Sequence, residues 1–171
     1  MNGRCVFGAQ YKQEDKEIML YEEKVIETIP VGPLGLIPLK SCTELGNKVD
    51  RYLVDWRRER ESEHKSTIAF TGYQRDSYII NASTPRFGSG EGKGIIEESV
   101  RGDDLYIMVD VCNYSLTYSL FGMTNHMSPD DHFQDLKRII AAAAGKARRI
   151  NVIMPFLYES RQHKRSGRES L

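Results

Sequence analysis

The chain has 171 residues, and its 24 Lys and Arg side chains equal its 24 Asp and Glu side chains in number. A formal charge of zero gives no whole-molecule attraction to nucleic acid or to an anionic membrane, so any anion binding must be local. The hydrophobic content of 40% is ordinary for a globular protein. No apolar run approaches the roughly 20 residues that span a bilayer. We expect one soluble domain with a tail, and neither a nucleic-acid nor a membrane partner.

The N-terminal sequence lacks the apolar core and small-residue cleavage site of a signal peptide, which indicates a cytoplasmic protein. Three widely spaced cysteines, Cys5, Cys42 and Cys112, fit neither a disulfide framework nor a zinc site. We therefore expect free thiols. For Cys112, at a strand end, a buried thiol is favoured over a nucleophile because no histidine partner is readable.

Residues 1–40 are expected to precede the domain proper. The first 25 or so are polar without a steady period, which indicates a weakly ordered extension. The following IPVGPLGLIPL, with three prolines, predicts an extended, irregular connector.

The domain is expected over residues 41–171, and its first helix is predicted by SCTELGNKVDRYLVDWRRERESE. Ser41 and Glu44 have the spacing of a capping box. A helical period predicts one buried face, formed by Leu45, Val49, Leu53 and Trp56. The charged residues that end the helix alternate in sign, which favours a solvated face over a polyanion-binding patch.

Short β-type runs follow at residues 67–70, 78–82 and 94–98. The glycine-rich STPRFGSGEGKG between the last two predicts a projecting hairpin. Next, DLYIMVDVC predicts a buried strand, SPDD the start of a capped helix, and INVIMPFL a second buried strand. This β-α-β order indicates an α/β fold whose sheet is mainly parallel, with flanking helices. The long segment 113–127 inside the unit suggests a lid or an assembly contact.

Ligands of open α/β sheets gather beyond the carboxyl ends of parallel strands. Arg161, Gln162, His163, Lys164 and Arg165 leave the last predicted strand at that edge. An arginine side chain can donate two parallel hydrogen bonds to phosphate oxygens, and a nearby lysine adds a positive point charge. From the residues alone, a phosphate site and an ordinary basic surface loop both remain open.

Two segments together resemble a known family. RFGSGEGKGIIEESVRGDDLYIMVDVC and GKARRINVIMPFLYESRQHKRSGRES are similar, in order and spacing, to the N-terminal domain of the ribose-phosphate pyrophosphokinases, the phosphoribosyl pyrophosphate synthetases. The resemblance covers residues 86–171. It implies a phosphoribosyltransferase-like α/β domain, the N-terminal half of a two-domain protein. It also implies transfer of diphosphate from MgATP to ribose 5-phosphate, for nucleotide biosynthesis.

The resemblance implies roles for seven residues. Phe87 would stack on adenine, Ser89 would contact the base, and Glu91 would accept from the adenine amino group. Arg161 and Gln162 match an Arg-Gln pair that holds ATP, with Lys164 and Arg165 assisting at the triphosphate. In the family the hairpin residues come from a neighbouring subunit, so a homo-oligomer is implied.

The family's metal-binding histidine, catalytic loop and ribose-phosphate loop do not occur in the 171 residues. We therefore expect an N-terminal piece of a longer enzyme, with no catalytic residue of its own and with the Mg²⁺ ligands outside it. Ser89, in place of Asn or Asp, and His163, in place of Asp, favour an alternative: a non-catalytic regulatory paralogue or a nucleotide-binding interaction module. An unrelated nucleotide-binding α/β domain is a third reading.

Two histidines, His126 and His132, lie near Asp130 and Asp131 and suggest a metal site. Helix capping explains both aspartates more simply, and we predict no metal ligands in the chain.

Overall fold

The computed structural model describes residues 30–63 and 73–168. The chain divides into two units between Pro30 and Val31, and every helix and strand that the structure describes lies in the second unit, Val31–Leu171. The weakly ordered extension expected over residues 1–25 and the β-type run expected over 67–70 lie outside the described residues. No helix among the described residues is long and apolar enough to cross a membrane.

A parallel sheet of three strands forms the centre, in the order β1 (Leu34–Pro38), β4 (Asp104–Met108) and β7 (Arg149–Ile153). The first strand corrects the sequence-based expectation of an irregular connector. Its prolines do not prevent pairing, because Pro33 precedes the strand and Pro38 is its last residue. Gly35 allows close packing, since a Cβ there would lie 2.5 Å from Ile80 Cδ1. The expected parallel α/β fold is confirmed.

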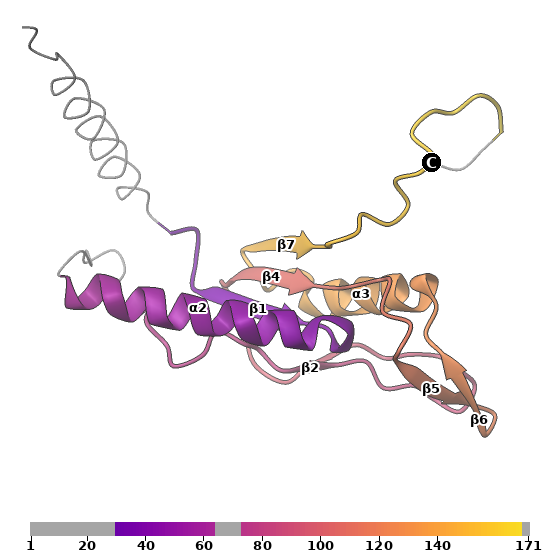
Figure 1. Ribbon diagram of the computed structural model, residues 1–171, viewed down its shortest axis with the longest axis horizontal. Coiled ribbons are helices and arrows are strands. Elements are labelled where there is room, and N and C mark those ends of the chain that lie inside the picture. Colours follow the sequence, from indigo (N-terminus) through magenta and orange to yellow (C-terminus); the bar gives the residue numbers. More distant parts are fainter. Residues whose placement is uncertain (1–29, 64–72, 169–171) are drawn as a thin grey trace, which may run out of the picture. The chain divides into compact units, whose positions relative to one another are not determined.

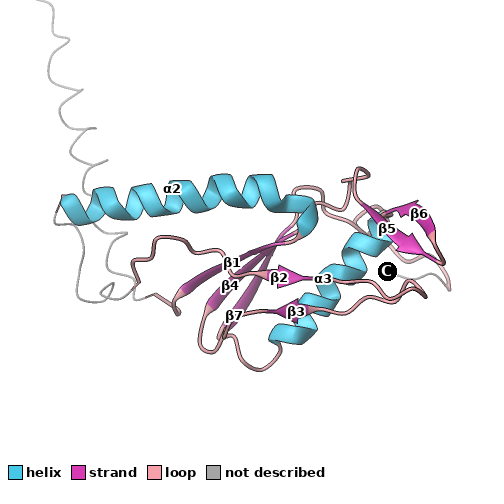
Figure 2. Ribbon diagram, turned by 90° about the horizontal axis from the view of Figure 1, so that it is seen from below, coloured by secondary structure: helices cyan, strands magenta, loops and turns pink. Residues whose placement is uncertain are grey.

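Two helices cover opposite faces of this sheet, α2 (Thr43–Ser62) and α3 (Pro129–Ala143), as Figure 2 shows. The pleat of the strands explains the arrangement, because successive side chains point to opposite faces. Leu36 and Tyr106 pack with Val54 of α2. Their neighbours Ile37 and Ile107 are completely buried in the larger cluster that includes Leu136 and Ile139 of α3.

The first helix forms as predicted, but its cap and its buried face differ. The N-cap is Cys42 without a side-chain hydrogen bond, because Ser41 Oγ instead accepts the Asp110 N–H at 3.1 Å. The buried positions are Gly46, Asp50 and Val54. The predicted face is therefore wrong at its ends, and Leu45 and Trp56 are 41% and 55% exposed. The Asp50 carboxylate accepts hydrogen bonds from the Tyr78 N–H at 2.6 Å and from the Ser77 hydroxyl at 2.9 Å. These bonds offset the cost of burying a charged side chain.

The predicted start of α3 is confirmed. Ser128 and Asp131 form a reciprocal capping box, with Pro129 in the first turn. Two further expectations are wrong. The last strand, β7, is not buried but is the outer strand of the sheet, with Val152 43% exposed. Cys112 is exposed, because the chain turns into a loop after β4, whereas Cys42 is buried; both are free thiols.

Two antiparallel hairpins complete the unit. The predicted projecting hairpin is present as β2 (Ala82–Ser83) and β3 (Ile95–Ile96), joined by the glycine-rich loop. Segment 113–127 contains a second hairpin, β5 (Thr117–Leu120) and β6 (Met123–His126), drawn in orange in Figure 1. The first hairpin packs on α3 so closely that a Cβ at Gly94 would lie 2.6 Å from the Arg138 carbonyl oxygen.

That close approach gives a stability prediction. Gly94→Ala should lower the free energy of unfolding by roughly 1–3 kcal/mol, because the contacted atom belongs to the helix backbone and cannot move aside. The matched variant Gly88→Ala meets nothing within 4 Å and should change it by less than about 0.5 kcal/mol. Urea denaturation of both variants measures the difference. Equal stabilities would contradict the packing of the hairpin on α3.

Candidate nucleotide site

The loop of the β2–β3 hairpin brings three predicted site residues together. The Phe87 N–H donates a hydrogen bond to the Glu91 carbonyl oxygen at 2.8 Å, and the Gly90 N–H donates one to the Phe87 carbonyl oxygen at 2.9 Å. Ser89 Oγ donates to Glu91 Oε2 at 3.1 Å. The aromatic ring and the carboxylate therefore project from one compact turn. Phe87 is 57% exposed, which leaves its ring accessible to a ligand.

Arg86 anchors this loop to the body of the domain. Its side chain is only 9% exposed, and its Nη2 lies 3.1 Å from Asp135 Oδ1 and 3.8 Å from Asp131 Oδ1. The N–H bonds do not point at these oxygens, so the contacts are ion pairs without hydrogen-bond geometry. The guanidinium also lies over the ring of Tyr118, 5.1 Å from its centroid. One buried cation thus joins the loop to α3 and β5.

A cleft of about 280 Å³ lies at the carboxyl end of β1. Its lining includes Lys40, Ser41, Arg86, Tyr118 and His132. His132 is buried, and its Nε2 lies 2.8 Å from the Asn113 carbonyl oxygen. A carbonyl only accepts, so Nε2 carries the proton. Lys40 is the exposed cation at the mouth.

The residues suggested for a metal site serve other purposes. Asp131 accepts from Ser128 in the helix cap, while Asp130 accepts from Tyr158. His126 Nδ1 lies 2.8 Å from the Tyr114 carbonyl oxygen. Over residues 30–63 and 73–168, no group of three or more His, Cys, Asp or Glu side chains could hold a metal ion.

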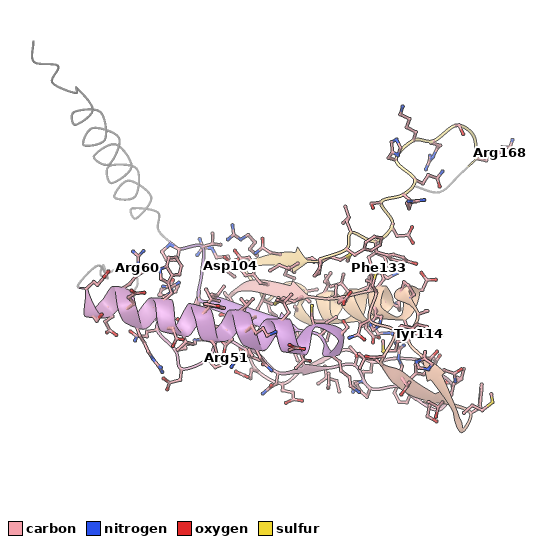
Figure 3. The ribbon with its side chains drawn as sticks, viewed as in Figure 1. Arg51, Arg60, Asp104, Tyr114, Phe133 and Arg168 are labelled. Atoms are coloured by element: carbon pink, nitrogen blue, oxygen red, sulfur yellow. The ribbon has the colours of Figure 1, made fainter. Side chains whose placement is uncertain are left out.

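The four other predicted residues, Arg161, Gln162, Lys164 and Arg165, lie in the exposed segment after β7. This segment leaves the sheet on the side away from the β2–β3 hairpin (Figure 1), and Figure 3 shows Arg168 at its far end. Within the chain, the structure therefore does not bring the basic segment to Phe87, Ser89 and Glu91.

Tyr158 ties the start of this segment to α3. Its hydroxyl donates to Asp130 Oδ1 at 2.6 Å, and its ring meets Phe133 edge-on at 5.5 Å. The hydrogen bond to Asp130, with smaller contributions from burial and from the Asp130 and Glu159 charges, raises the pKa of Tyr158 to about 12. Burial, followed by the Asp110 charge, likewise raises the pKa of the Cys42 thiol, so this cysteine stays protonated and unreactive.

Sequence reasoning did not identify Arg86, Tyr158 or the β5–β6 hairpin as parts of the site. The hairpin carries one readable signal, Gly122, because glycine is common in tight turns; in the structure Phe121 and Gly122 have positive φ, 49° and 80°. The pairing of Arg86 with Asp131 and Asp135 leaves no such signal, since the partners lie far apart in the chain.

The parallel sheet, its two flanking helices and the β2–β3 hairpin define a phosphoribosyltransferase-like α/β domain. A family model described as the N-terminal domain of ribose phosphate pyrophosphokinase matches residues 34–171. The chain belongs to this family. A comparison with curated proteins gives no match.

The shifted pKa of Tyr158 gives a pH prediction. A raised phenol pKa means that the contact contributes fully to stability below the ordinary pKa of 10, and that the contribution is lost as the pH rises toward about 12. Tyr158→Phe removes this titration. The difference between the tyrosinate absorbance titrations of wild type and variant should therefore have its midpoint near 12. A midpoint near 10 would contradict the contact.

Proposed function

We propose that the protein is a ribose-phosphate diphosphokinase, which transfers diphosphate from MgATP to ribose 5-phosphate and forms phosphoribosyl pyrophosphate for nucleotide biosynthesis. The family match over residues 34–171 is the observation that carries the proposal, because it includes both the hairpin and the basic segment. In this proposal the domain supplies part of the ATP site and an oligomer interface. The groups that act on the ribose lie outside these 171 residues.

The hairpin loop recognises the base. Phe87 offers an exposed ring for stacking, a contact that any base can make through its π face. Glu91 supplies selectivity for adenine, because a carboxylate accepts from the exocyclic amino group. Ser89 holds one carboxylate oxygen of Glu91 at 3.1 Å, which leaves the other oxygen for the base.

The basic segment recognises the triphosphate. Arg161, Lys164 and Arg165 concentrate positive charge in a protein whose formal net charge is zero. Guanidinium groups fork onto phosphate oxygens, and charge neutralisation is a main source of catalysis in phosphoryl-type transfer. The magnesium ion arrives with ATP as part of the substrate.

Assembly completes the site. The hairpin loop and the basic segment leave opposite sides of the sheet, so one chain does not present them to the same nucleotide. A homo-oligomer in which the loop of one subunit faces the basic segment of the next satisfies this geometry. Each chain then contributes its hairpin loop to one ATP site and its basic segment to another.

Two variants test the assignment in the complete protein. Phe87→Ala should raise the KM for ATP roughly 5- to 150-fold, the loss expected for one base stacked on an aromatic ring. Arg161→Ala should also raise it, because a charge-assisted hydrogen bond to phosphate is lost. A coupled assay for phosphoribosyl pyrophosphate formation measures both effects.

Tyr52→Ala and Arg51→Ala are matched controls, since both residues are exposed on α2. They should leave the KM for ATP unchanged. Unchanged ATP affinity in both site variants would refute the site. ATP binding without product formation in the wild type would instead favour the non-catalytic paralogue that Ser89 and His163 suggest.

A further inference from the structure

The tip of the β5–β6 hairpin is docked on the base-binding loop. The Phe121 N–H donates to the Gly88 carbonyl at 3.0 Å, which joins the turns of the two hairpins directly. Gly88 is the immediate neighbour of Phe87. The backbone of the second hairpin therefore lies within one hydrogen bond of the loop that carries the proposed stacking ring.

Side-chain packing supports this backbone contact. Gly90 adopts a φ of +89°, and a Cβ at this position would lie 2.8 Å from Leu120 Cδ1. The turn of the base-binding loop thus has room for Leu120 only because residue 90 is a glycine. Tyr118, from the same strand as Leu120, lies under the Arg86 guanidinium. The loop is held by the second hairpin at both ends, at Arg86 and at Gly90.

Phe121 stands at the tip with its side chain 77% exposed. Its backbone φ is 49°, in the left-handed region where phenylalanine is disfavoured, in a turn completed by Gly122. A large apolar ring at an exposed, strained turn position adds nothing to the core. Its backbone is instead bonded to Gly88, the neighbour of Phe87, whose ring is also exposed.

We propose that Phe121 extends the base-binding surface, so that the aromatic side chains of Phe87 and Phe121 together contact the purine ring of the nucleotide. This inference rests on the proposed function, which assigns Phe87 to the base. Stacking does not distinguish one base from another, since every base has a π face. Phe121 therefore adds affinity for the base, while Glu91 retains the choice of adenine.

Such a surface is also pre-organised. The loop and the tip are joined by the Phe121–Gly88 hydrogen bond and by the close approach of Leu120 to Gly90, so less loop entropy is lost on binding. In this proposal segment 113–127 is a binding element, because its tip is seated on the loop that carries Phe87.

The test compares Phe121→Ala, Phe121→Leu and Phe121→Tyr in the complete protein. Loss of one stacking contact predicts a rise in the KM for ATP of roughly 5- to 150-fold for the alanine variant, with kcat unchanged. The leucine variant should be weakened similarly, because it keeps the apolar bulk but not the ring. The tyrosine variant should retain affinity close to wild type.

Inorganic tripolyphosphate serves as a probe that lacks a base. Its inhibition constant against ATP should be the same for wild type and Phe121→Ala, whereas ATP itself binds the variant more weakly. Met123→Ala is the matched control, since Met123 is 64% exposed on the same hairpin. This control should leave the KM for ATP unchanged, and thermal unfolding should show that all variants fold.

The outcomes separate this inference from the proposed function. If Phe87→Ala raises the KM for ATP and Phe121→Ala does not, the inference is wrong and the proposed function stands. If neither variant affects ATP, the base site itself is wrong. A Phe121→Ala protein that changes oligomeric mass at unaltered KM would make Phe121 a subunit contact, which also overturns the inference. An equal loss of tripolyphosphate affinity would do the same.

Discussion

The buried ion pairs of Arg86 are the interaction on which the site depends. A charge with 9% of its side chain exposed is tolerated only when opposite charges lie close by, and Asp135 and Asp131 provide them from α3. Both carboxylates have second partners, Arg138 for Asp135 and the Ser128 cap for Asp131. The start of α3, the loop of the β2–β3 hairpin and β5 are thereby coupled. Breaking such a pair leaves a buried charge uncompensated, so the loop geometry and the stability of the domain are inseparable at this point.

The parallel sheet separates the two groups of predicted site residues. The hairpin loop and the segment after β7 leave the sheet on opposite sides (Figure 1), and Tyr158 ties the start of that segment to α3. Neither group alone surrounds a nucleotide: Phe87 supplies apolar surface without cations, and Arg161 supplies charge without a base platform. In the homo-oligomer that we propose, nucleotide binding would therefore depend on assembly of the subunits.

Local signals in the sequence predicted most of the fold, and contacts distant in sequence account for what was missed. The capping box of Ser128 and the apolar run of β4 are local patterns, and both predictions are confirmed. The strand β1 was missed because its prolines and glycines are typical of loops, and only the pairing with β4 makes it a strand. For the candidate site, the roles of the hairpin loop were predicted through resemblance, and the structure adds the ion pairs of Arg86 and the hydrogen bond from Phe121 to Gly88. Asp135 lies 49 positions from Arg86, and Gly88 lies 33 positions from Phe121, so neither contact is visible to any periodicity.

We propose that one ATP site is built from the hairpin loop of one subunit and the basic segment of another. Subunit complementation tests it most directly. Phe87→Ala and Arg161→Ala proteins are each assayed alone for phosphoribosyl pyrophosphate formation at limiting ATP, and then after dissociation and reassembly together. The account predicts that the mixture is more active than either variant, because some interfaces then combine an intact loop with an intact segment. A mixture no more active than the average of the two variants would contradict it.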